Sequence, residues 1–140
     1  MFLLDTDALS ELERLSPDPG LLAWLETVDW LDLHLSVITV GELWKGIAQL
    51  PHGRKRRALE VMFDLIPDRF YGRILPVDYA IAVEFGEIQA KTGPLPSLDT
   101  LIAATAITNR LTLVTHNSHD MARTGAPILH PWTAAQGSVC

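Results

Sequence analysis

The stretch FLLDTDALSE, residues 2–11, changes from an apolar strand to a helix at a single aspartate. Its first residues are apolar without interruption, as in a strand that is covered on both faces. Leu9 then begins a helical series that Leu12 and Leu15 continue. Because parallel α/β sheets bind ligands at the carboxyl ends of their strands, Asp5 at this junction is the first candidate site residue.

The same alternation continues along the whole chain. Strands are predicted at residues 2–5, 31–37, 74–77 and 111–115, with an edge strand at 127–130, and helices at 6–15, 21–29, 39–50, 54–66, 79–92 and 97–109. Strands that alternate with helices form a parallel sheet covered on both faces. We therefore expect an α/β fold: a three-layer sandwich whose central, mostly parallel sheet of four or five strands is flanked by helices.

Size and composition limit the class of protein. A chain of 140 residues, 48% hydrophobic and 20% charged, is expected to form one domain over residues 1–140, with a core that needs no disulfide. The sole cysteine, Cys140, excludes an internal disulfide and a cysteine-based zinc site. Asp5 interrupts the apolar start, so we expect no signal peptide, no membrane span and a cytoplasmic location.

The basic residues are few but concentrated. The formal charge of −6 argues against broad, unspecific attraction to nucleic acid. Four consecutive basic residues nevertheless form one cluster: Arg54, Lys55, Arg56 and Arg57. The cluster is either a solvated helix face or a contact for an RNA backbone or a protein partner. Its place at a helix N-terminus, where cations are mildly disfavoured, supports the second interpretation.

Acidic and amide side chains follow several predicted strands or begin the helices beside them: Asp5, Glu42, Asp99, Asn117 and Asp120. We expect these residues to converge on one rim of the sheet. Two carboxylates about 4 Å apart repel by about 4 kcal/mol at an effective dielectric constant of 20. Either some of the acids are protonated or a divalent cation neutralises them, and an all-oxygen rim suits Mg²⁺ or Mn²⁺. We favour the metal ion.

Each acid also has a purely structural interpretation. Thr39 and Glu42 have the spacing of a capping box, in which Glu42 would reach back to the start of its own helix. Asp5 could cap the helix that follows it, and Asp99 lies two residues after Ser97, an expected N-cap, where the helix dipole favours negative charge. The joint pattern, more than any single acid, indicates a functional site.

Four ordered blocks carry a family resemblance: residues 3–11, 36–43, 98–106 and 111–117, followed by Pro131 and Trp132. They resemble the PIN-domain ribonucleases, and specifically the toxins of bacterial VapBC toxin–antitoxin pairs. The resemblance covers nearly the whole chain. It implies a PIN-like domain, a cognate antitoxin as partner and a homodimer.

The resemblance also implies metal-dependent cleavage of RNA that leaves a 5′-phosphate and a 3′-hydroxyl. Asp5, Glu42 and Asp99 occupy the best-defined acidic positions and are the implied ligands of Mg²⁺ or Mn²⁺. The fourth acidic position of the family falls on the neutral Asn117, for which Asp120 is a possible substitute. Asp7, where the family often has asparagine, either adds charge or supports Asp5.

Two other functions remain open from the residues alone. Residues 5–9 resemble the nucleophile motif of haloacid dehalogenase-like phosphatases, with Asp5 as nucleophile, although Leu9 replaces the usual threonine or valine. A non-catalytic interaction module, whose acidic rim receives an arginine from a partner, is the other alternative. His116 and His119 have the spacing of a ligand pair, but histidines in a loop are usually solvated.

Overall fold

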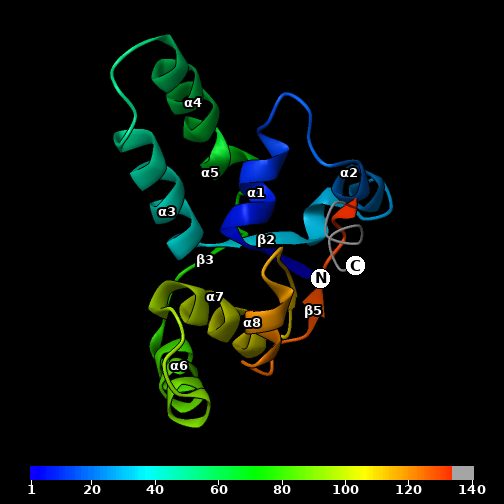
Figure 1. The fold of residues 1–140 in the computed structure, drawn as a ribbon, viewed down its shortest axis with the longest axis vertical. Helices are drawn as coiled ribbons and strands as arrows, with labels where there is room; N and C mark the ends of the chain where they lie inside the picture. Colours follow the sequence, from blue (N-terminus) through cyan, green and yellow to red (C-terminus); the bar gives the residue numbers. More distant parts are fainter. Residues whose placement is uncertain (134–140) are drawn as a thin grey trace.

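Five short parallel strands form the centre of the molecule, in the order β3-β2-β1-β4-β5 (Figure 1). They are β1 (Phe2–Leu4), β2 (Leu33–Ser36), β3 (Ile74–Leu75), β4 (Thr112–Val114) and β5 (Ile128–Leu129). The structure is a computed structural model that describes residues 1–133. Cys140 and the last residues of the predicted domain 1–140 lie outside the described residues. The predicted sheet is confirmed, including its edge strand.

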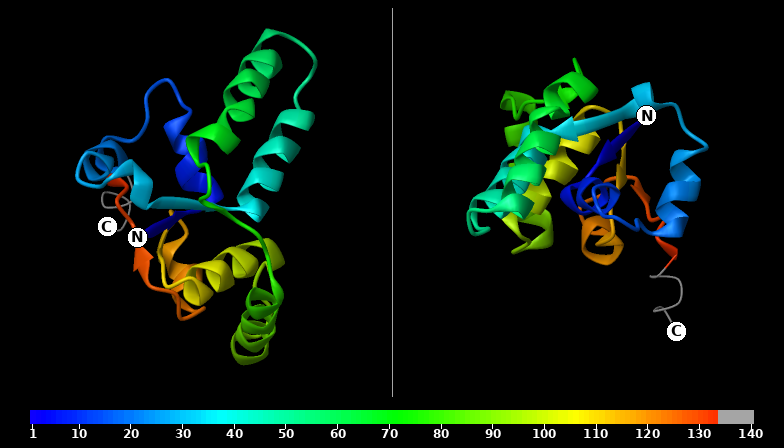
Figure 2. Two further views of the ribbon diagram at one scale, coloured as in Figure 1. Left: turned by 180° about the vertical axis from the view of Figure 1, so that it is seen from behind. Right: turned by 90° about the horizontal axis from the view of Figure 1, so that it is seen from above.

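Helices cover both faces of this sheet. They are α1 (Thr6–Leu12), α2 (Pro19–Leu25), α3 (Val37–Ala48), α4 (Arg54–Asp64), α5 (Ile66–Arg69), α6 (Tyr79–Thr92), α7 (Ser97–Thr108) and α8 (Ser118–Ala122). Leu4 packs in the core under α1 to α5, whereas its neighbour Leu3 packs under α7 and α8, as the alternation of side chains along a strand requires. Because helices pack on both faces of the sheet, the predicted three-layer arrangement is confirmed (Figure 2). The α6 helix packs on α7. In residues 1–133 no helix has the length and apolar character needed to cross a membrane.

Local capping explains where the observed elements depart from the predicted ones. Asp18 caps α2 by accepting from the Leu21 backbone N–H, so this helix begins at Pro19 and not at residue 21. The 3-10 turn η1 (Trp30–Asp32), capped by Asp29, shortens the second strand from its predicted start at residue 31. The short helices α5 and α8 were not predicted, because elements of four or five residues carry too little periodicity.

Two expected helix caps are wrong. The N-cap of α3 is Ser36, whose hydroxyl accepts from the Ile38 N–H, and Thr39 is already buried inside the helix. The N-cap of α7 is Pro96, without a side-chain hydrogen bond, and Ser97 is the first helical residue. The predicted capping role of Asp5 is confirmed, because its Oδ1 accepts from the Ala8 N–H at 2.9 Å. The capping box therefore does not explain Glu42, whereas Asp99 remains in the first turn of α7, where the helix dipole favours its charge.

The segment after β5 returns to pack on α2. The Trp132 side chain is buried in the same core as Leu4 and Leu21, as expected of a core tryptophan. Oδ2 of Asp18 accepts from the backbone N–H groups of both Leu21 and Thr133. At Gly20 the two backbones approach so closely that an added Cβ would lie 2.3 Å from the carbonyl oxygen of Pro131. Glycine is required at this contact because there is no room for a side chain.

We expect Gly20→Ala to lower the free energy of unfolding by about 1–3 kcal/mol, because the backbone of residues 131–133 must move. Gly86→Ala in α6, where an added Cβ meets nothing within 4 Å, should instead stabilise the protein by about 0.5–1 kcal/mol. Urea unfolding of both variants measures the two effects. A Gly20→Ala protein as stable as the parent would show that this close contact does not constrain the fold.

Candidate active site

Asp5 joins the first strand to the first helix. Its backbone N–H donates to the Val114 carbonyl of β4, which extends the sheet by one residue, and its carboxylate caps α1. The side chain also accepts a hydrogen bond from the hydroxyl of Thr115, which directly follows β4 and is fully buried. Asp5 is only 9% exposed. The fold therefore holds this carboxylate rigidly at the carboxyl edge of the sheet.

A small pocket of about 50 Å³ opens at this edge. Its polar lining consists of Asp5, Asp7, Asp99, Thr115 and Asn117, and its apolar wall of Ile102, Leu113 and Met121. Asp99 reaches the pocket from the first turn of α7, although it is far from Asp5 in sequence. The structure thus brings Asp5, Asp99 and Asn117 together, as predicted, and adds Asp7 to them.

Burial and crowding disfavour ionisation of the two central aspartates. Burial raises the pKa of Asp5 to about 7, and the negative charges of Asp7 and Asp99 add to this, against the hydrogen bonds from Thr115 and Ala8. Burial also raises the pKa of Asp99, with further contributions from Glu42, Asp7 and Asp120. Within residues 1–133, no basic side chain forms an ion pair with any of these five acids.

Glu42 stands at the margin of the pocket and is held by residues of two helices. Its Oε1 accepts a hydrogen bond from the hydroxyl of Thr6 in α1, and that hydroxyl also lies 3.3 Å from the Thr39 hydroxyl. This contact between α1 and α3 replaces the expected capping box. Glu42 does not line the small pocket, yet it is near enough to raise the pKa of Asp99.

The structure separates the two candidates for the fourth position. Asn117 lines the pocket, and its backbone N–H donates to the Thr115 hydroxyl. Asp120 lies in α8 outside the pocket lining, but its charge acts on Asp99. The threonines that hold the acids, Thr6 and Thr115, were not singled out from the sequence. The one available signal for Thr115 was a polar residue at the end of the predicted strand 111–115.

The donor set suits a hard divalent cation. The polar side chains that line the pocket all present oxygen atoms, apart from the amide nitrogen of Asn117. Among residues 1–133, no three histidine, cysteine, aspartate or glutamate side chains form a ready-made metal cage. Mg²⁺ does not need such a cage, because it commonly keeps several waters and is held by one or two carboxylates. Asp5 and Asp99 satisfy that requirement.

A larger groove of about 560 Å³ runs beside the pocket between α1, α3 and α4. Its floor is apolar and includes Leu43, Ile47, Leu59 and Phe63, whereas Thr6, Glu13, Arg14, Glu42 and Lys55 carry polar groups along it. Glu42 lines this groove, and its negative charge also raises the pKa of Asp99 in the small pocket. The groove has the dimensions and apolar character of a site for a folded or extended peptide.

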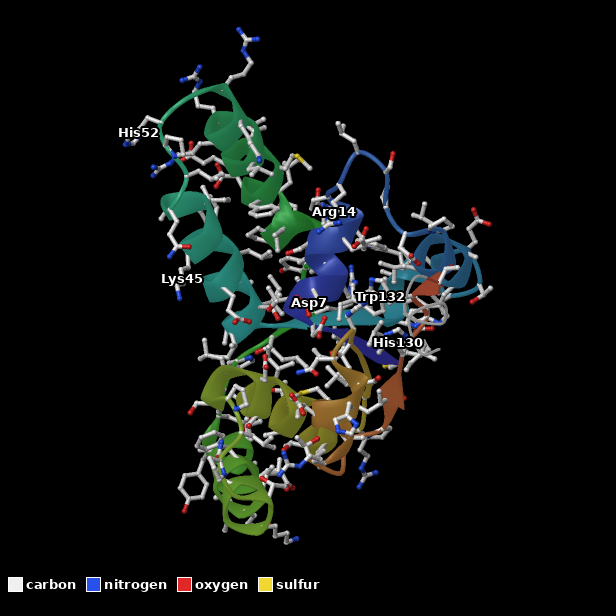
Figure 3. All side chains as sticks on the ribbon, in the orientation of Figure 1. Asp7, Arg14, Lys45, His52, His130 and Trp132 are labelled. Carbon is white, nitrogen blue, oxygen red and sulfur yellow. The ribbon has the colours of Figure 1, made fainter. Side chains whose placement is uncertain are left out.

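The predicted basic cluster lies at the far end of the α3–α4 hairpin from the sheet (Figures 1 and 3). Arg56 is held by its own turn, because its Nη1 donates to the Leu50 carbonyl and its Nε lies 3.7 Å from Glu60. Arg54, Lys55 and Arg57 are exposed, and Lys55 also lines the groove. Three of the four basic side chains are therefore available to a partner.

Comparisons with known proteins agree with this architecture. The family model of the PIN domain matches residues 2–127. Toxin FitB of Neisseria gonorrhoeae is 37% identical over 94% of this chain and 99% of its own length. VapC ribonuclease Y4jK of Sinorhizobium fredii is 33% identical over 96% of this chain and 100% of its own length. The crystal structure of FitAcB from Neisseria gonorrhoeae has a TM-score of 0.87 and 36% identity, covering 95% of this chain and 99% of that one.

The raised pKa of Asp5 predicts that the metal-free protein loses stability as pH rises. In the folded protein the Asp5 carboxyl keeps its proton up to about pH 7, whereas in the unfolded chain it ionises near pH 3.8. The free energy of unfolding is therefore highest at low pH and falls as the pH rises from about 4 to 7. Asp5→Asn keeps an oxygen for the Ala8 N–H but cannot ionise. The free energy of unfolding of the Asp5→Asn variant should equal that of the parent near pH 4 and exceed it by at most about 4 kcal/mol at pH 8.

Urea unfolding in EDTA at pH 4, 6 and 8 measures this difference. Asp64→Asn, at the exposed end of α4, controls for the loss of one negative charge elsewhere. If the difference in the free energy of unfolding between Asp5→Asn and the parent stayed constant across this range, the raised pKa of Asp5 would be contradicted.

Proposed function

Because this chain belongs to the PIN domain family, we propose that it is the toxin of a type II toxin–antitoxin pair and hydrolyses RNA phosphodiester bonds with a divalent metal ion. The observation that carries the proposal is the buried carboxylate of Asp5 beside the half-buried carboxylate of Asp99, neither of which has an ion-pair partner in the described chain. Relatives that are named a toxin and a ribonuclease support it. The phosphatase alternative is not retained, because the family is a different one.

Each acid has a distinct task in this proposal. Asp5 and Asp99 hold Mg²⁺ or Mn²⁺ at the small pocket. When bound, the metal ion polarises a phosphate oxygen and lowers the pKa of a water that attacks phosphorus in line. Glu42, fixed by Thr6, orients the attacking water or binds a second ion. Asn117 or Asp120 would hold substrate or a water of the bound ion.

The larger groove between α1, α3 and α4 is the proposed binding site of the antitoxin. An apolar floor beside the acidic centre suits an amphipathic peptide whose basic residue reaches the carboxylates. Such a peptide would supply the positive charge that the described residues lack. We also propose a homodimer, which the family resemblance implies. An RNA substrate fits the cytoplasmic location expected from the sequence.

Cleavage of a single-stranded RNA should require Mg²⁺ or Mn²⁺ and stop in EDTA. Asp5→Asn and Asp99→Asn should each lower kcat by about 100-fold or more, because each removes a charge that holds the metal ion. Glu87→Gln, an exposed acid on α6, controls for net charge and should cleave like the parent. Gel analysis of labelled RNA with each variant measures these rates.

Full cleavage by either aspartate variant would refute the site assignment. No cleavage by the parent protein under any metal condition, together with tight antitoxin binding, would favour the non-catalytic interaction module. Asn117→Ala and Asp120→Asn, assayed beside the others, identify the fourth position: the residue that belongs to the site shows the larger fall in kcat.

The exposed part of the basic cluster should contribute to RNA binding through phosphate contacts. Replacing Arg54, Lys55 and Arg57 together by glutamine should reduce the slope of log affinity against log salt by up to about 2, since each contact to single-stranded RNA contributes about 0.7. Arg56 is left intact because it supports the Leu50 turn. Binding titrations with uncleaved RNA test this, with Lys91→Gln as control. An unchanged slope rejects the contact.

A further inference from the structure

A second pocket, of about 700 Å³, lies on the other side of α1 from the groove floor. It is lined by Asp7, Ser10, Glu11 and Arg14 of α1 and its end, by residues 16–19, and by His116 and Trp132. Asp7 also lines the small acidic pocket, so the two pockets share a wall. Its volume falls in the range of about 300–1,000 Å³ that is typical of small-ligand sites. None of the roles assigned above uses this space.

Two rings that line this pocket, His116 and Trp132, belong to a cluster of three rings that also includes His130. The His116 ring lies 5.1 Å from the rings of both His130 and Trp132, and the latter two lie 5.3 Å apart. Trp132 is buried, so it supports the cluster from behind, whereas His116 is exposed and faces the pocket. The His116 ring meets Trp132 edge-to-face at an interplanar angle of 87°, and its exposed side is open to a base.

The opposite side of the pocket carries an available cation. The Arg14 side chain is 71% exposed, and its ion pair within residues 1–133 is a 3.8 Å contact with Glu11. Glu11 is mostly buried and already accepts a hydrogen bond from the Asp18 backbone N–H. The Arg14 guanidinium therefore gains little from its present partner and can pair with a phosphate instead. Figure 3 shows Arg14, Asp7 and Trp132 on this side of α1.

We propose that this pocket, here named the His116 pocket, is a nucleotide subsite in which the base next to the scissile phosphate stacks on His116 and its phosphate pairs with Arg14. The inference rests on the proposed function, since a strand bound at the acidic pocket continues past Asp7. Proteins that bind single-stranded RNA use histidine rings and arginine side chains for unstacked bases and phosphates in this way. His116 is then a binding residue that selects for unpaired RNA, because a base within a duplex cannot enter the pocket.

The test compares His116→Ala with His116→Phe on a single-stranded oligonucleotide that the parent protein cleaves at one mapped position. His116→Ala should raise KM by about 10-fold and change kcat by less than about 2-fold, as expected when a stacking contact is lost. His116→Phe, which keeps a flat ring against Trp132, should restore most of the affinity. His119→Ala in α8, outside the lining, is the matched control and should behave like the parent.

A series of substrates, each with one abasic nucleotide near the cleavage position, provides a second readout. One abasic position should raise KM about 10-fold for the parent but no further for His116→Ala, because the same contact is already lost. Unchanged KM in His116→Ala, or a defect in His116→Phe equal to that of His116→Ala, would overturn the subsite while leaving the nuclease intact. Absence of RNA cleavage by the parent protein would overturn the proposed function and the subsite together.

Discussion

The central constraint on this structure is the gathering of several carboxylates at one edge of a parallel sheet, where none of them has an ion-pair partner among residues 1–133. Asp5 is the centre of this arrangement, because it terminates β1, caps α1 and lies buried beside Asp99. Burial raises the pKa of this carboxyl toward neutrality. The remaining features of the site either fix these carboxylates in place or provide what they lack.

The positions of the acids are maintained by hydrogen bonds that oppose the electrostatic cost. The hydroxyl of Thr115 and the Ala8 N–H both donate to Asp5, and the hydroxyl of Thr6 donates to Glu42. These donors favour the charged form of each acid, while burial and neighbouring charge favour the neutral form. A cation, or a basic residue from a partner, would relieve the same repulsion. In the proposed function, metal binding, partner binding and stability would therefore be linked through one cluster of charges.

The α1 helix organises the surroundings of this cluster although it is only seven residues long. One side of it contributes Thr6 to the apolar groove, and another contributes Asp7 to both the acidic pocket and the His116 pocket. Ser10 and Arg14 line both the groove and the His116 pocket. A peptide in the groove and an RNA strand at the active site would thus meet at the same helix.

The sequence alone determined the alternation of strands and helices, hence the parallel sheet, and the rule that strand ends meet at one edge identified Asp5, Asp99 and Asn117 before any contact was known. The capping box predicted at Thr39 was wrong, because Thr39 packs into the core and Ser36 caps the helix instead. Nor could the sequence show that Thr115 binds Asp5 or that His116 rests on Trp132, residues that are distant or unremarkable in sequence. Periodicity reports which face of an element is buried, but contacts between elements depend on how those faces pack in three dimensions.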